Sequence, residues 1–368
     1  MEAGFLQHGR FQALLDVLHG CGYRCIGPQV RDGAIVYNAL TTCRELPQGV
    51  RDLQSAGSYR LERTSGLRYF GWANGPQALK PMVFAPEETL WRVQRADDGA
   101  LRFSASRPSF ANLAVIGVRA CDLAALALLD RHFLGTAVVD SCYAARRLGM
   151  FLVAVHCSDP SGSCFCASTG DGPQASGGFD LALSELDEGF IVETGSARGA
   201  DTVAGLGLEP VTASQRDAAA RQIDTARARQ RRGLPSRDLR AALVSNPEHP
   251  RWEQVAQRCL ACGNCTSVCP TCFCHAACDS MELDGSAGAH ARIWDSCFTA
   301  GHSQIHGLTV RPDTRTRYRQ WLTHKLGSWH EQFGRSGCVG CGRCISWCPA
   351  GIDITEEAAA ICSGSSDG

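Results

Sequence analysis

Eight cysteines form two copies of one pattern, which is the strongest chemical signal in the sequence. The stretches CLACGNCTSVCP at 259–270 and CVGCGRCISWCP at 338–349 both read C-x2-C-x2-C-x3-C-P. Three thiolates at this spacing can surround one [4Fe-4S] cube, because small residues such as Gly263 and Gly342 let a short loop wrap the inorganic core. In two-cluster ferredoxins the fourth cysteine binds the other cluster. The pattern therefore predicts two crossed ligand sets, Cys259, Cys262, Cys265 and Cys348, and Cys338, Cys341, Cys344 and Cys269.

A repeated C-x-x-C pattern is also typical of structural zinc sites in cytoplasmic proteins. Tetrahedral zinc takes two cysteine pairs, whereas each motif here offers four cysteines followed by a proline, in the order of bacterial ferredoxins. The duplication therefore favours two iron-sulfur clusters over zinc.

Four cysteines in the first half of the chain form a second candidate site. Cys121 follows the strand-like run AVIGV, and Cys157 follows the strand-like run FLVAV. Ligands gather at the carboxyl ends of strands in α/β sheets, and Cys164 and Cys166 follow in a Gly/Ser-rich loop that can fold back toward them. Three interpretations stay open: a third [4Fe-4S] cluster, which we favour, structural thiols, or zinc or a redox thiol pair.

The remaining cysteines carry weaker signals. Cys272, Cys274, Cys278 and Cys297 lie between the two motifs, and Asp295 stands near the last of them. We expect PTCFC and WDSC to pack around the first cluster, where thiol and N–H groups tune its potential, or else to supply a ligand to another cluster. We expect structural roles for the other five, Cys21, Cys25, Cys43, Cys142 and Cys362.

Length and composition indicate an ordinary globular chain of more than one domain. The 368 residues exceed what one hydrophobic core usually supports, 44% are hydrophobic, and the net charge is −1. No stretch reaches the roughly 18 uninterrupted apolar residues that a membrane span needs. No basic segment followed by an apolar core opens the chain, so we expect no secretory signal. Twenty-one cysteines in such a chain indicate reduced thiols and a cytoplasmic location. Nothing in the charge predicts nucleic-acid binding.

Two domains are expected on either side of a linker at about 234–250. Residues 1–245 predict a mixed α/β domain, with an N-terminal helix, two hairpins around Asp-Gly turns, and two buried strands separated by a helix. Residues 246–368 hold both motifs. Sixty-eight residues separate Cys269 from Cys338, including the helix-like stretch 313–333, so a mostly α-helical dicluster domain and an α+β chain are expected. This arrangement looks like the alpha-helical ferredoxins of fumarate reductases and heterodisulfide reductases.

Basic residues gather on the helix-like stretch from Arg315 to Lys325. They either form a solvated face, as such charges usually do, or lie near a cluster. An all-cysteine [4Fe-4S] site is negatively charged in its usual states, so nearby cations would ease its reduction or dock an acidic partner.

An ordered series of further motifs carries a family resemblance. PTCFC at 270–274, WDSC at 294–297 and RYRQWLTHKL at 317–326 precede the second cysteine motif, and GVRACDLAAL at 117–126 and CSDPSGSCFC at 157–166 lie in the first domain. Together they resemble the beta subunit of cytoplasmic sulfhydrogenases, which are NAD(P)-linked nickel-iron hydrogenases. The A subunit of anaerobic sulfite reductase is similar. The resemblance covers most of the chain and is weakest before about residue 100.

The resemblance implies an electron-transfer iron-sulfur subunit without a catalytic centre of its own. Its expected partners are a flavin/NAD(P) subunit, an iron-sulfur small subunit and a catalytic nickel-iron subunit, or a siroheme subunit in the sulfite reductase alternative. The chain lacks G-x-G-x-x-G and a Walker lysine, and GLGLEP at 205–210 does not supply the fingerprint, so we expect no flavin or NAD on this chain. An iron-sulfur sensor is the alternative from another class.

Overall fold

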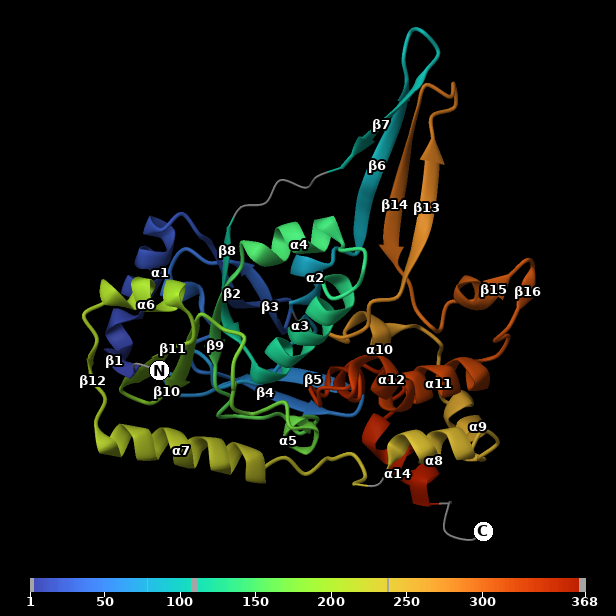
Figure 1. Ribbon diagram of the computed structural model, residues 1–368. Coiled ribbons are helices and arrows are strands. Elements are labelled where there is room, and N and C mark those ends of the chain that lie inside the picture. Colours follow the sequence, from blue (N-terminus) through green and yellow to red (C-terminus); the bar gives the residue numbers. More distant parts are fainter. Residues whose placement is uncertain (1–2, 78, 107–111, 237, 364–368) are drawn as a thin grey trace.

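An eight-stranded mixed sheet forms the centre of the N-terminal part (Figure 1). The computed structural model describes residues 3–77, 79–106, 112–236 and 238–363. From edge to edge the strands are β12 (Glu209–Pro210), β1 (Ala3–Gln7), β11 (Gly189–Thr194), β10 (Leu181–Glu185), β9 (Phe151–Val155), β8 (Leu113–Val118), β2 (Arg24–Arg31) and β3 (Ala34–Ala39). Strands β2, β8, β9 and β10 are parallel and the outer pairings are antiparallel. The mixed sheet is as expected.

Helices cover both faces of this sheet because its central strands are apolar on both sides. In β9, Phe151 joins the core that contains α1 (Phe11–Gly20), whereas the next residue, Leu152, joins the core that contains α3 (Ala120–Phe133). The opening stretch MEAGFLQHGRFQALLDVLHG was expected to form one helix, but only its second half does, as α1, and residues 3–7 pair with β11 as strand β1. The other helices of this part are α2 (Lys80–Val83), α4 (Ser141–Leu148), α5 (Cys166–Thr169), α6 (Ala197–Ala204) and α7 (Ala213–Ala228).

A second sheet of four long strands projects from the body (Figure 1). Its order is β13 (His275–Met281), β14 (Ala287–Trp294), β6 (Glu87–Arg95) and β7 (Leu101–Ala105). Both hairpins are antiparallel, and β14 pairs with β6. The hairpin from β6 to β7 was predicted. Its pairing with a hairpin from the cysteine-rich part joins segments almost 200 residues apart.

Helices and loops pack around the two cysteine motifs in the C-terminal part. The helices are α8 (Leu239–Ser245), α9 (Arg251–Ala256), α10 (Asn264–Ser267), α11 (Thr314–Thr323), a π-helical turn (His324–Ser328), α12 (Trp329–Phe333), α13 (Arg343–Ser346) and α14 (Ile354–Ser363). Apolar side chains of α8, α9, α11 and α14 share one core with Cys259, Cys265, Cys344 and Cys348 at its edge, whereas Trp329 and Phe333 of α12 pack with Cys121, Cys166 and Cys341. The helix expected over 313–333 is present, with the π-helical turn inside it.

The α+β class is confirmed, but the expected mostly helical character of residues 246–368 is not. The segment between the two motifs contains β13 and β14 and a short hairpin of β15 (Gln304–Ile305) and β16 (Leu308–Thr309). The expected linker also contains a helix, α8.

A small hairpin of β4 (Val50–Ser55) and β5 (Ser58–Arg63) reaches from the N-terminal part to the second cysteine motif. At its turn, the Gly57 N–H donates to the Ile345 carbonyl at 3.0 Å. In addition, the Ser346 hydroxyl donates to Gln54 Oε1 at 2.6 Å. The hairpin therefore fixes α13 against the rest of the chain.

Candidate iron-sulfur centres

The two cysteine motifs adopt the same backbone shape. Ala261 and Gly263 in the first motif have φ of 50° and 75°, and Gly340 and Gly342 at the matching positions have φ of 63° and 75°. In each loop the N–H of the first of these residues donates to the sulfur of the leading cysteine, at 3.4 Å for Cys259 and 3.5 Å for Cys338. Left-handed residues at alternate positions curl the loop so that its three cysteines face one side.

The first three cysteines of the first motif line one cavity together with the last cysteine of the second. Cys259, Cys262, Cys265 and Cys348 border this space, along with Cys344. Its remaining walls are mainly apolar side chains and glycine, among them Phe298, Tyr318, Trp321, Ile352 and Ile354. The Ile352 N–H donates to the Cys348 sulfur at 3.4 Å. A set of thiols in an apolar cavity with N–H donors fits a [4Fe-4S] cluster. The structure thus brings together the four cysteines of one predicted ligand set.

The other predicted set also lies together. Burial raises the pKa of the Cys344 thiol, and the charges of Cys338, Cys341 and Cys269 raise it further. Cys269 comes from the first motif, so this group also combines three cysteines of one motif with one cysteine of the other. A hydrogen bond from Cys272 lowers the pKa of Cys269 well below its usual range, and Lys325 acts in the same direction. Cys272 therefore contacts a predicted ligand.

Two buried lysines lie beside Cys269. Lys325 Nζ donates to Thr271 Oγ1 at 2.9 Å, and Lys80 Nζ donates to the carbonyl oxygens of Thr266 at 3.2 Å and Ser267 at 3.1 Å. Burial lowers the pKa of Lys80, but for Lys325 the neighbouring thiolates outweigh burial and the pKa is raised. Lys325 thus lies near a predicted cluster, whereas Arg315 and Arg319 of the same basic stretch pair with exposed Glu248. Nothing in the sequence around Lys80 predicted that it would lie near a cysteine motif, because its contacts in that motif are 186 or more residues away.

The N-terminal cysteines are buried and lie near one another. Cys121 is the second residue of α3, Cys157 follows β9, and Cys164 and Cys166 lie in and just after the loop that precedes α5. Burial raises the pKa of the Cys164 thiol, and the charges of Cys157 and Cys166 raise it further. Cys121 lies near Cys166 and near Cys341 of the second motif. The carboxyl ends of the parallel strands therefore gather thiols as predicted.

Polar side chains around this quartet donate to its sulfurs. Asn74 Nδ2 donates to Cys121 at 3.7 Å, and Gln230 Nε2 donates to Cys166 at 3.4 Å. Ser161 Oγ lies 3.2 Å from the Cys164 sulfur. Donors to sulfur stabilise thiolates and raise the reduction potential of a bound cluster, so the residues present fit an iron-sulfur group. Asn74 and Gln230 are remote in sequence and were not predicted.

A buried ion pair joins the quartet to the second motif. Arg343 donates to both oxygens of Asp122, at 2.7 and 3.0 Å, and each side chain is 1% exposed. Arg343 lies between Cys341 and Cys344, and Asp122 directly follows Cys121. The pair therefore holds the two cysteine sets in one fixed relation.

The backbones of the two sets also pack directly on each other. The Phe165 N–H donates to the Gly340 carbonyl at 2.8 Å. A Cβ atom at Gly340 would lie 2.5 Å from the Cys166 nitrogen, and one at Gly342 would lie 2.4 Å from the Ser163 carbonyl oxygen. Glycine is thus required in the second motif by close approach as well as by its φ.

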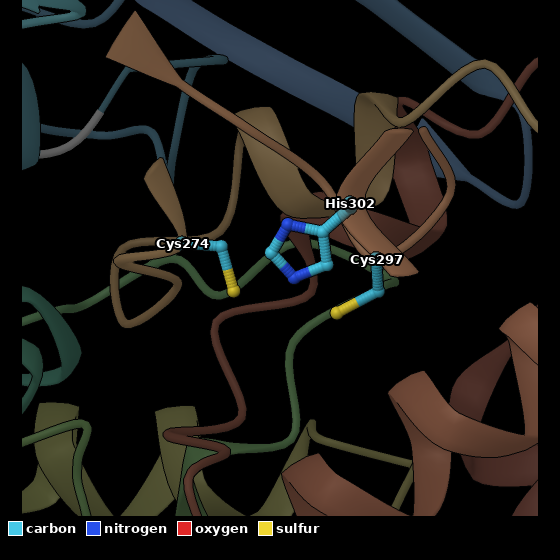
Figure 2. Close-up of side chains that lie close together, drawn as sticks. All are labelled: Cys274, Cys297 and His302. Carbon is cyan, nitrogen blue, oxygen red and sulfur yellow. The ribbon is translucent and has the colours of Figure 1, made fainter. Parts of the chain in front are cut away.

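The leftover cysteines separate into three groups. Cys274 and Cys297 come together with His302, and the three ligand atoms lie within 4.8 Å of one another (Figure 2). A hydrogen bond with Cys274 lowers the pKa of Cys297 to about 7 and raises that of His302 to about 9. Cys278 is exposed on β13. Of the five expected to be structural, Cys25, Cys142 and Cys362 are buried, Cys43 is half-buried and Cys21 is exposed.

One loop presents three thiols to a cavity that a cysteine of the other loop completes, and the second loop repeats its backbone shape; these features are typical of an iron-sulfur protein of the dicluster type. In agreement, residues 258–352 match the family model described as a 4Fe-4S dicluster domain. The sulfhydrogenase 2 subunit beta of Pyrococcus furiosus is 30% identical over 305 residues, which cover 80% of this chain and 86% of that protein. The chain belongs to the family of sulfhydrogenase beta subunits.

No solved structure matches the chain. Within the described residues, none of the helices combines the length and apolar character that crossing a membrane requires.

The two motifs allow a matched test of the packing between the cysteine sets. Gly263 and Gly342 share φ of 75°, so alanine at either costs about 1–2 kcal/mol for the left-handed backbone. At Gly342 the new Cβ would also strike the Ser163 carbonyl, whereas at Gly263 it meets the Ser296 hydroxyl at 3.2 Å, a side chain that can rotate. We expect Gly342→Ala to lower the thermal unfolding midpoint and the bound iron more than Gly263→Ala does. Equal losses in the two variants would contradict this packing.

Proposed function

We propose that this chain is the electron-transfer beta subunit of a soluble, cytoplasmic, NAD(P)-linked nickel-iron hydrogenase. It relays electrons between a flavin/NAD(P) subunit and the hydrogenase module. The observation that carries the proposal is the contact between the N-terminal quartet and the second motif, in a chain of the sulfhydrogenase beta family. Electron transfer through one subunit requires that its cluster sites lie next to one another, as these two cysteine sets do.

Three [4Fe-4S] clusters are proposed, each of which takes up and releases one electron when bound. Cys259, Cys262, Cys265 and Cys348 hold the first, Cys338, Cys341, Cys344 and Cys269 the second, and Cys121, Cys157, Cys164 and Cys166 the third. The protein holds these thiolates in place, excludes water with apolar walls, and supplies N–H donors and buried cations that offset negative charge.

The proposed order of the clusters follows from exposure and contact. Cys262 and the neighbouring Leu260 are exposed, with Leu260 68% exposed, so the first set reaches the surface. The second set lies beside the first set, because its Cys344 borders the cavity of the first set. It also lies beside the N-terminal quartet, because the Cys341 carbonyl oxygen is 3.9 Å from the Cys164 sulfur. Electrons would pass along this row, and the second set is its middle member.

The domain division at 245/246 is retained as part of the proposal, with residues 1–245 carrying the third site and residues 246–368 the other two. Flavin and NAD(P) chemistry and catalysis at nickel-iron are assigned to partner subunits, so this chain has no catalytic residues of its own.

Isolation of the native complex tests the proposed function. A tagged chain purified anaerobically from its own host should bring down a flavoprotein and a nickel-iron subunit, and the preparation should reduce NAD(P) with hydrogen. Recovery of a siroheme subunit that reduces sulfite would assign the chain to anaerobic sulfite reductase instead. A chain recovered without any redox partner would favour a sensor.

The crossed ligand sets predict which cluster each fourth cysteine serves. Cys348→Ala should alter the paramagnetic signal of the cluster held by Cys259, Cys262 and Cys265, although it is remote from them in sequence. Cys269→Ala should alter the other cluster of the pair, and Cys278→Ala, at an exposed position, should alter neither. Damage by Cys348→Ala to the cluster of its own motif alone would refute the crossing.

The third cluster predicts an iron content that depends on the quartet. The reconstituted full chain should contain about twelve iron atoms, and Cys164→Ala should lose about four of them while keeping the signals of the other two clusters. Iron and acid-labile sulfide analysis with low-temperature paramagnetic resonance measures both. Eight iron atoms, unchanged in Cys164→Ala, would leave the quartet as structural thiols.

A further inference from the structure

Cys274, Cys297 and His302 come together at the base of the projecting hairpin, outside the three cysteine sets. Cys274 directly precedes β13, Cys297 is the third residue after β14, and His302 lies in the short 3-10 turn Gly301–Ser303. Figure 2 shows the two sulfur atoms and the imidazole ring turned toward one another. Their ligand atoms all lie within 4.8 Å of each other. Within the described residues, this is the group of three or more His, Cys, Asp or Glu side chains that meets this distance.

The geometry suits a single ion better than a cube. Two ligands at about 2.3 Å from a tetrahedral ion lie roughly 3.8 Å apart, so three ligand atoms confined within 4.8 Å can share one ion after small adjustments. Thiolates at separate corners of an iron-sulfur cube lie farther apart. A set of two cysteines and one histidine is also a donor set that zinc uses.

Asp295 orients the histidine as a metal ligand requires. Asp295 Oδ2 lies 2.7 Å from His302 Nδ1, so Nδ1 carries the proton that it donates to the carboxylate. Nε2 is then the nitrogen with a free lone pair. Metal-binding histidines almost always donate their other N–H to a carboxylate or carbonyl in this manner, and the contact fixes both the tautomer and the ring plane.

The charges also balance. Two thiolates neutralise a divalent ion and the neutral imidazole adds no charge, so the ion with its three ligands would be neutral in this mostly buried position. Cys297 is 9% exposed, and the side chain of His302 is 25% exposed. Three protein ligands leave one tetrahedral position, which a water molecule can reach on the half-exposed side.

We propose that Cys274, Cys297 and His302 bind one zinc ion, with Asp295 as the positioning residue. The ion would tie the two ends of the hairpin, where the Asp295 N–H already donates to the Cys274 carbonyl at 2.9 Å. Toward the N-terminus, the chain before Cys274 leads directly to Cys272 and Cys269. Next to Cys297, Ser296 contacts the first motif, since its Oγ accepts a hydrogen bond from Thr266 Oγ1 at 2.8 Å. The zinc would therefore brace the loops that hold the first two clusters.

Metal analysis of the full chain tests the proposal. After anaerobic reconstitution with iron, sulfide and zinc, followed by dialysis, mass spectrometry should find about one zinc per chain. Cys297→Ala and His302→Ala should lose this zinc and keep their iron. The hairpin supplies matched controls, since Cys278 is an exposed cysteine on β13 and His290 is a histidine paired with Asp279. Cys278→Ala and His290→Ala should keep the zinc.

A milder variant guards against a failure to fold. Asp295→Asn keeps the shape of the side chain, and it should weaken zinc binding about ten- to a hundredfold in competition with a chelator. Zinc absorption spectra of the unaltered chain should show two sulfur neighbours and one nitrogen neighbour from protein. Absence of zinc, or zinc unchanged in His302→Ala, would overturn the proposal. So would a Cys274–Cys297 disulfide, or loss of about four iron atoms in Cys297→Ala.

Discussion

The ion pair between Arg343 and Asp122 is the most deeply buried charged contact between the two halves of the chain. Both side chains are 1% exposed, so neither charge has water to stabilise it. Arg343 completes its hydrogen bonds with the Gly75 carbonyl at 3.1 Å and with Asn74 Oδ1 at 3.1 Å. Breaking such a pair by removing one partner typically costs about 3–5 kcal/mol, because the other charge stays buried. The pair therefore favours the observed placement of the second motif on α3, in which both charges are paired.

Buried cations are a general feature of the cysteine-rich centre, and their positions follow the thiolates. Arg343 lies between two proposed ligands, and Lys325 and Lys80 flank Cys269 and Cys272. A buried lysine or arginine is costly unless it is paired, and so is a set of buried thiolates. Placing them together reduces both costs. The same cations favour the more negative, reduced state of a bound cluster, so one arrangement serves stability and electron transfer.

The sequence predicted the parts of the site that depend on local spacing and on periodicity. The motif cysteines, the strands before Cys121 and Cys157, and the helix over 313–333 could all be read from short stretches. The contacts that Asn74, Lys80 and Gln230 make at the cysteine sets could not, because each comes from a loop or helix whose partner lies 47 or more residues away. The hairpin of β13 and β14 was missed for a related reason, since β14 is stabilised by pairing with the remote strand β6.

The duplicated motifs have the same backbone but different surroundings, and the surroundings explain where their sequences differ. Ala261 and Gly340 occupy matching left-handed positions, and Gly340 lies directly against the backbone of Cys166. At the first position a methyl group is tolerated because the loop reaches the surface at Leu260 and Cys262. Asn264 and Arg343 occupy matching positions in the two loops. Asn264 donates to the Trp347 carbonyl at 3.3 Å at the surface, whereas Arg343 pairs with Asp122 in the interior. Of the two loops of the repeat, one thus faces outward and the other packs against the sheet domain. In the proposed row of clusters, that difference in environment would distinguish the end of the electron path from its middle.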